Sequence, residues 1–248
     1  MPVESWHDLT AMPEARTQAL HAVRSLRSDA AANRERVLAA ATIAIKRDGE
    51  KVPMAEIAAH AGVGIGTLYR HYPTRARLLD DLSERSYRLV LEHARLAAAS
   101  RGSAAAALTR FFEQTISARD DLILPLHGGP VSLDESVVAV RAQISDLLEQ
   151  VLDRGRADGT IRPDVTAIDI IITGAMLAQP LPHTPNWDRL ARRQAAIYVA
   201  GLSAGNTKPL PGRRPTRAQL EAGFEQAQPG PTSSQRARTS RRKPTASG

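Results

Sequence analysis

Residues 54–72 read MAEIAAHAGVGIGTLYRHY, and this stretch predicts two short helices joined by a tight turn. Apolar residues recur at helical spacing over 54–61 and again over 65–72. Gly62 permits a sharp turn between the two runs, where Val63 can pack. Pro73 ends the second helix because proline lacks the backbone N–H that a helix interior requires. Such a pair is a helix-turn-helix candidate, although an ordinary helical corner has the same pattern.

The outward positions of the second helix favour nucleic-acid binding over an ordinary corner. They are Gly66, Thr67, Arg70 and His71, which are small or able to form hydrogen bonds, and none is acidic. A surface that approaches phosphates needs donors and must avoid carboxylates. A merely solvated surface would more often carry Glu.

The rest of the chain predicts helices, so we expect an all-α fold. Ala-rich composition with only 4% aromatic residues suits closely packed helices better than sheets. Apolar periodicity predicts helices over 30–47, 75–99, 103–119, 134–157, from after Pro163 to about 179, and over 187–203. Gly and Pro predict a loop over 120–133. A three-helix head followed by a helical body is therefore expected.

The net charge of +7 lies at the C-terminal end of the chain. Residues 205–248 hold nine Lys or Arg against two Glu, which accounts for the whole +7 and leaves residues 1–204 neutral. Apolar residues are too sparse there to offset the entropy lost on ordering. We therefore expect a disordered basic tail, with at most a transient helix over 216–226, that adds non-specific attraction to nucleic acid.

Several classes of protein are disfavoured by the sequence. There is no cysteine, no pair of histidines at i+3 or i+4, no Gly-rich phosphate loop and no G-x-S-x-G turn. We therefore expect no enzyme, no catalytic residue, no metal and no cofactor. No apolar run reaches the roughly 18–20 residues that span a bilayer, and the N-terminus does not resemble a signal peptide. The expected location is the cytoplasm, without a membrane partner.

The segment that contains the predicted helix-turn-helix resembles the DNA-binding domain of the TetR family. The resemblance rests on Ala61-Gly62-Val63, on Gly66-Thr67-Leu68-Tyr69-Arg70-His71-Tyr72-Pro73-Thr74-Arg75 and on Leu78-Leu79, and it covers about 50 residues with the helix over 33–47. Three positions depart from the family pattern. Pro53 and Gly64 stand where Ser or Thr is usual, and Arg75 replaces a more usual lysine.

The resemblance implies which residues contact DNA. The second helix would lie in the major groove, with Thr67 and Arg70 reading bases. Tyr69, His71 and Arg75 would contact phosphates, as would the start of the first helix. The expected DNA-contacting set is Gly64, Ile65, Thr67, Tyr69, Arg70, His71, Arg75 and Arg34.

The stretch over 168–178 is apolar nearly all round, and such a helix must be covered on most sides. It is either a core helix of a monomer or, as the resemblance implies, part of a four-helix interface between two copies. The expected dimer contacts are Ile171, Gly174, Ala175, Ala178, Ala195 and Tyr198.

The resemblance implies a ligand pocket in the helical body. Each candidate pocket residue also has an ordinary structural explanation. His127 is either a polar pocket contact or an exposed loop residue. Phe111, Phe112 and Met176 are either pocket wall or ordinary core.

The expected organisation is an arm over 1–29, a DNA-binding domain over 30–74, a ligand-binding and dimerisation domain over 75–204, and the tail over 205–248. The expected function is a repressor that binds a palindromic operator as a homodimer and responds to an unidentified small-molecule effector. Two alternatives stay open. One is a non-specific architectural DNA binder that uses the tail, and the other is a helical small-molecule binding protein with a vestigial head.

Overall fold

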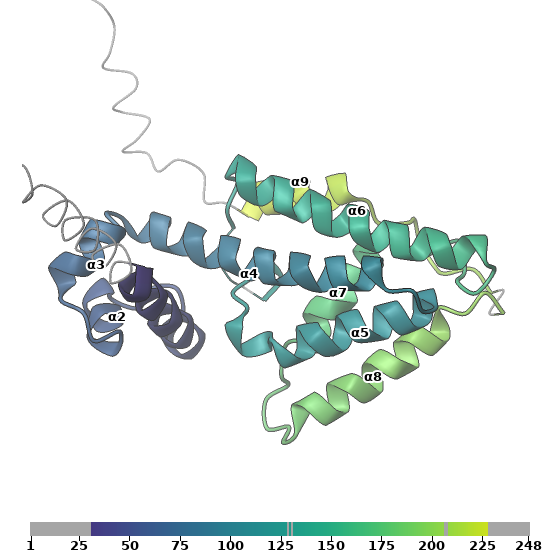
Figure 1. The fold of residues 1–248 in the computed structure, drawn as a ribbon, viewed down its shortest axis with the longest axis horizontal. Helices are drawn as coiled ribbons and strands as arrows, with labels where there is room; N and C mark the ends of the chain where they lie inside the picture. Colours follow the sequence, from purple (N-terminus) through teal and green to yellow (C-terminus); the bar gives the residue numbers. More distant parts are fainter. Residues whose placement is uncertain (1–30, 128, 130, 206–207, 228–248) are drawn as a thin grey trace, which may run out of the picture. The chain divides into compact units, whose positions relative to one another are not determined.

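The computed structural model describes residues 31–127, 129, 131–205 and 208–227 (Figure 1). The predicted arm over 1–29 and the last part of the predicted tail lie outside the described residues. Contacts divide the chain into two compact units between Leu78 and Leu79. We call the described residues up to Leu78 the head and those from Leu79 onward the body.

The described part of the chain is built from helices, which confirms the predicted all-α class. A helix over 31–48 comes first. It is followed by α2 (Met54–His60), α3 (Ile65–His71), α4 (Arg75–Ala99), α5 (Ala104–Ser117), α6 (Glu135–Ala157), α7 (Ala167–Leu177), α8 (Trp187–Gly201) and α9 (Arg217–Ala227). Two short 3₁₀ turns, η1 (Arg119–Asp121) and η2 (Pro125–His127), interrupt the loop between α5 and α6. Within the described ranges β pairing is limited to an isolated bridge between Ile161 and Ser203.

The head is a small helical unit with its own core. Val37, Ile57 and Leu68 are fully buried, one each from the first helix, α2 and α3. Gly62 adopts φ +64° in the turn between α2 and α3, a left-handed conformation that costs an L-residue with a side chain about 1–2 kcal/mol. The predicted turn glycine is therefore required by the backbone.

The body is organised around α5, which contacts α6, α7 and α8 (Figure 1). Phe111 and Phe112 of α5 are buried at its centre. Gly155 of α6 lies close against neighbouring elements. A Cβ built there would lie 2.7 Å from the Cβ of Ala104 and would overlap the side chain of Ile161. Glycine at this position lets α6 pack directly on the start of α5.

The structure corrects the prediction of a disordered tail for the residues it describes there. Residues 217–227 form α9, and Phe224 of this helix is buried against the body. The preceding segment is held by a hydrogen bond from Arg162 Nη2 to the Lys208 carbonyl oxygen (2.5 Å) and one from Leu210 N to Asp164 Oδ2 (3.0 Å). The prediction failed because it weighed the segment's own few apolar residues and not the body surface on which they dock.

None of the helices in the described part of the chain is both long and apolar enough to cross a membrane.

Candidate functional site

The surface of α3 is the candidate nucleic-acid interface. Leu68 points into the head, whereas Ile65 and Tyr69 leave 43% and 47% of their surface exposed. Arg70 is also exposed, and Thr67 is half-buried. The helix carries no acidic residue, so its outer side offers donors and apolar atoms and no carboxylate.

Thr67 and Arg70 contact each other on this surface. Arg70 Nη2 donates to Thr67 Oγ1 over 3.3 Å, as expected for residues one helical turn apart. The contact is exposed to solvent and holds the guanidinium along the outer side of α3. The structure therefore brings together the two residues that the sequence predicts as base readers.

Two glycines at the start of α3 are not required by the packing of the head. A Cβ built on Gly64 or Gly66 meets no described atom within 4 Å. Gly64 precedes the helix with φ −66°, which any residue adopts. Without side chains at these two positions, the backbone at the N-terminal end of α3 stays accessible from outside. The packing of the core gains nothing from either glycine.

Arg34 and Arg75 are engaged inside the head. Arg34 Nε donates to the Tyr72 hydroxyl over 3.3 Å. Arg75 donates from Nη1 to the Glu50 carbonyl oxygen (2.6 Å) and from Nη2 to the Val52 carbonyl oxygen (2.5 Å). Arg75 thus ties the start of α4 to the turn before α2, a structural role that the sequence did not suggest. A phosphate contact for either arginine stays a prediction.

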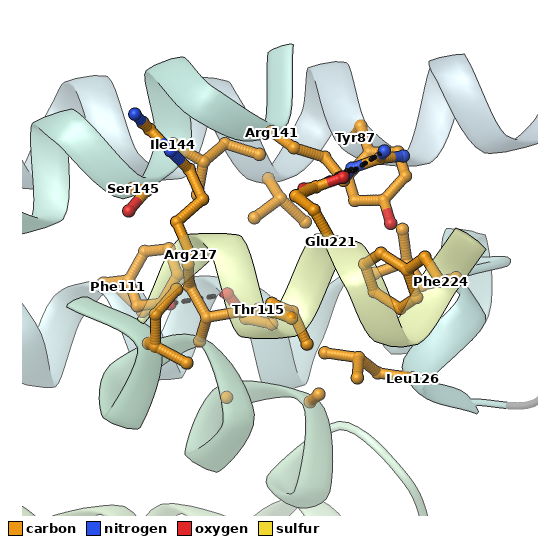
Figure 2. A pocket seen from close by; sticks show the side chains of 17 residues that line it. Tyr87, Phe111, Thr115, Leu126, Arg141, Ile144, Ser145, Arg217, Glu221 and Phe224 are labelled. Carbon is orange, nitrogen blue, oxygen red and sulfur yellow. Dashed lines mark hydrogen bonds and ion pairs between the residues drawn. The ribbon is translucent and has the colours of Figure 1, made fainter. Parts of the chain in front are cut away.

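A second candidate site is an apolar pocket inside the body, shown in Figure 2. Its free space is about 60 Å³, which is room for a few water molecules. The wall is formed by residues of α4, α5, α6, α7, η2, α9 and the loop before η2. They are Tyr87, Val90, Phe111, Thr115, Leu124, Leu126, Arg141, Ile144, Ser145, Ile168, Ile171, Gly174, Ala175, Arg217, Leu220, Glu221 and Phe224.

Arg141 of α6 is the buried charge of this pocket, with a side chain that is 5% exposed. Its Nε lies 2.9 Å from Glu221 Oε1 and its Nη2 lies 2.5 Å from Glu221 Oε2, a two-point contact between guanidinium and carboxylate. Nη1 donates to the Ser132 carbonyl oxygen over 2.9 Å. The guanidinium carbon also lies 5.5 Å from the ring centre of Tyr87 and 5.3 Å from that of Phe224.

The electrostatics of the pocket follow from this burial. Burial has the largest single effect and would lower the pKa of Arg141, but the Glu221 carboxylate and Tyr87 together outweigh burial and raise it. Burial also raises the pKa of Tyr87 to about 12, against the opposing effect of the Arg141 charge. At neutral pH the pocket therefore holds a cationic Arg141 and a neutral phenol.

The structure places the four predicted pocket residues in different surroundings. Phe111 lines the pocket, and Phe112 is fully buried in the core beside Phe111 and Tyr198. Met176 is 69% exposed, which contradicts its assignment to the pocket. Its side chain leaves α7 on the side opposite to Gly174 and the phenylalanines. The side chain of His127 lies outside what the structure describes.

Sequence reasoning missed Arg141, although a signal was present. Arg141 falls on the apolar stripe of α6 with Val137, Val140, Ile144 and Leu148, which are all buried. An arginine on such a stripe is either paired in the interior or part of a site. Its partner Glu221 lies 80 residues away, so the sequence pattern did not connect the two.

The predicted dimer contacts stay a prediction, and the structure places these residues against their own protomer. Ile171, Gly174 and Ala175 line the pocket, and Ala178 and Ala195 are buried in the core of the same protomer. Tyr198 is half-buried and meets the Phe112 ring edge-on at 5.7 Å. These residues face inward because the small side chains of α7 and α8 pack on α5. The exposed apolar residues of this region are Met176, Leu181 and Ile197, at 69%, 59% and 55% exposure.

Across the described ranges, no cluster of three or more His, Asp or Glu side chains could hold a metal ion.

Comparison with known proteins agrees with a helical DNA-binding head followed by a helical body. Residues 37–82 match the model for bacterial regulatory proteins of the tetR family, and residues 90–204 match the C-terminal domain model of SbtR-like transcriptional regulators. No curated protein matches the chain in sequence.

Solved structures give the same result. A TetR transcription regulatory protein from Mycobacterium vanbaalenii is 31% identical with a TM-score of 0.50, and the match covers 72% of this chain and 99% of that one. The ketosteroid transcriptional regulator KstR2 of Mycobacterium tuberculosis has 18% identity, a TM-score of 0.55 and coverage of 68% and 94%. AibR, solved in complex with isovaleryl coenzyme A and operator DNA, has 20% identity, a TM-score of 0.57 and coverage of 69% and 98%. Together with the exposed α3 of the head, these matches show that the chain is a DNA-binding transcriptional regulator of the TetR family.

Proposed function

We propose that this regulator is a repressor that binds a palindromic operator as a homodimer and releases it when a small molecule fills the pocket of the body. The observation that carries the proposal is the presence of both sites in one chain. One is an exposed helix without acidic residues, and the other is an apolar pocket with a buried charge. DNA binding belongs to residues 30–74, and effector binding and dimerisation belong to 75–204 together with α9. Such a regulator acts in the cytoplasm, where bacterial DNA lies.

The DNA-binding part of the proposal rests on the outer side of α3. In the major groove, Arg70 would reach base edges, and Thr67 would hold it through the 3.3 Å hydrogen bond. Gly64 and Gly66 would let the backbone approach the duplex closely. Ile65, Tyr69 and His71 would flank these contacts on the same short helix.

The homodimer part rests on the uncovered apolar residues of α7 and α8 and the loop that joins them. Met176, Leu181 and Ile197 are large, apolar and more than half exposed. Exposed apolar side chains that lie together mark an interaction surface, and we propose that these three form one. A two-fold copy of the same surface would cover them and supply a second recognition helix, as a palindromic operator requires.

The effector part is supported by the pocket and by AibR, which was solved with both a coenzyme A thioester and operator DNA. A ligand shifts a protein between two states only through its difference in affinity for them. Each factor of ten in that preference for the state that does not bind DNA is worth about 1.4 kcal/mol.

The test is to select operator fragments from a genomic DNA library with the full chain and to map the protected sequence by footprinting. We expect one short palindrome and a dimer bound to it. Thr67→Ala and Arg70→Ala should each weaken operator binding by about 1–3 kcal/mol and relax the base preference at one position per half-site. The double variant should lose less than the sum, because the two side chains contact each other.

The matched control is Arg101→Ala, which removes an exposed cation from the loop between α4 and α5. It should leave the base preference unchanged. Selection of random sequences with uniform protection would refute the operator reader and favour the architectural binder. An unchanged base preference in Thr67→Ala and Arg70→Ala would refute the role of α3.

A further inference from the structure

The pocket of the body is completed by α9. Figure 2 shows α9 lying across the pocket, with Arg217, Glu221 and Phe224 directed toward residues of the other helices. Leu220 is also part of the wall. With α9 in place the free space is about 60 Å³, so an effector larger than a few water molecules cannot enter beside it. Binding of such a molecule therefore requires part of the wall to move, and α9 contributes Arg217, Leu220, Glu221 and Phe224 to that wall.

The attachment of α9 is suited to release. Its 11 residues are too few for a stable isolated helix in water, so its helical state depends on docking. Its ion pair from Arg217 to Asp146 of α6 (2.8 Å) is exposed, and exposed pairs contribute little.

Arg141 determines what can replace α9. Its buried guanidinium is neutralised by the carboxylate of Glu221, which is a residue of α9 itself. Removing α9 alone would leave an uncompensated charge in an apolar site, which is strongly unfavourable. A replacement must therefore bring one negative charge in a planar group that accepts two hydrogen bonds, followed by apolar atoms in place of Leu220 and Phe224.

We propose that the effector of this pocket is an apolar carboxylic acid, whose carboxylate takes the place of Glu221 on Arg141 and whose tail displaces α9 from the body. This inference rests on the proposed function only where it calls the ligand an effector. The binding step itself does not depend on that function. Glu221 and Phe224 act as a built-in occupant that the ligand must exchange with. A phosphate monoester fits less well, because its second charge would have no partner in an apolar wall.

The test uses hexanoate, decanoate and 4-phenylbutyrate as probes, with methyl decanoate as the neutral analogue. Binding is measured by calorimetry on the full chain, and hydrogen exchange is followed in peptides from residues 217–227. We expect at least one acid to bind and to accelerate exchange in 217–227, whereas methyl decanoate does neither. Slower exchange in 217–227 on binding would overturn displacement, because α9 would then be closing over the ligand.

Three variants test the role of the charge. Glu221→Gln keeps the shape of the side chain but weakens the competitor, so the binding acid should gain roughly tenfold in affinity. Glu225→Gln removes the same charge from an exposed position of the same helix and should leave affinity unchanged. Arg141→Met should abolish binding while thermal melting reports whether the variant folds, and Arg141→Lys, which cannot form the two-point contact, should weaken binding if Arg141→Met does not fold.

Failure of this inference and failure of the proposed function give different results. No binding of any of the three acids to either the native chain or Glu221→Gln would overturn the inference, even if the chain selects an operator. Equal binding of decanoate and methyl decanoate would also overturn it. A chain that binds an acid and releases α9 but selects no operator would uphold the inference and refute the proposed function.

Discussion

Substituting Phe224 by Ala should release α9 from the body without unfolding the rest of the protein. Phe224 is 7% exposed and its ring lies 5.3 Å from the Arg141 guanidinium carbon. Loss of a buried Phe side chain costs about 1.5–3 kcal/mol in transfer free energy. Loss of the cation–π contact adds about 0.5–2 kcal/mol. With a sum of about 3 kcal/mol, the population of undocked α9 should rise about a hundredfold.

Hydrogen exchange measures this population directly. Amides in residues 217–227 should exchange about a hundredfold faster in Phe224→Ala, if they exchange through local release. Amides of α6, residues 135–157, should keep their native rates. The matched control is Gly223→Ala, since Gly223 is exposed and a Cβ there meets no described atom within 4 Å. This change should raise helix stability by up to about 1 kcal/mol and slow exchange in 217–227.

Two results would refute the reasoning. If exchange in 217–227 is unchanged in Phe224→Ala, the docking of α9 does not depend on the aromatic contact. If α6 accelerates together with α9, the helix is part of the cooperative core of the body and cannot act as a separable element.

Three other predictions concern the head and the packing of the body. Gly66→Ala should leave the melting temperature unchanged or raise it, since the new Cβ meets open space, yet weaken operator binding measured by titration; native affinity would exclude a close backbone approach to DNA. Gly155→Ala should lower the free energy of unfolding by about 1–3 kcal/mol, because its Cβ collides with Ala104 and Ile161; a chemical denaturation midpoint equal to the native one would contradict the packing. Burial lowers the pKa of His93, and the charge of Glu92 opposes this shift. Just below 6.5, the ordinary pKa of histidine, the unfolded chain therefore binds more protons than the folded chain, so stability should fall as the pH drops through that value. His93→Gln should flatten this part of the melting temperature against pH curve, and a variant curve parallel to the native one would show that His93 is not responsible.

Periodicity was sufficient to predict most helices of this chain. The fourth helix was predicted over 75–99, which are its observed bounds, and the helix-turn-helix was predicted to within one residue at each end. This succeeded because a helix with one apolar side has a repeat that belongs to the sequence alone. Gly62 was also predictable, since its left-handed φ is a local property of the turn.

The sequence did not predict which residues of an all-apolar helix face the interior of the protein. In α7, Gly174 faces Phe111 and Phe112, while Met176, two residues later, is exposed. The sequence suggested the reverse, with Gly174 at a dimer interface and Met176 in the pocket. A helix that is apolar on every side has no moment to orient it, so packing against α5 decides which residues turn inward.

The sequence by itself therefore determined the helices up to α8, their order, the turn of the head and the chemistry exposed on α3, but not α9. Only the tertiary structure decided that Arg75 holds the carbonyl oxygens of Glu50 and Val52, and that Arg141 is paired with Glu221. The physical reason is the range of the interactions. Backbone hydrogen bonds of a helix join residues four apart, so the sequence of a short segment is enough to predict them. The Arg141–Glu221 pair spans 80 residues, and it forms because the folded body leaves a buried charge that a distant short helix can neutralise.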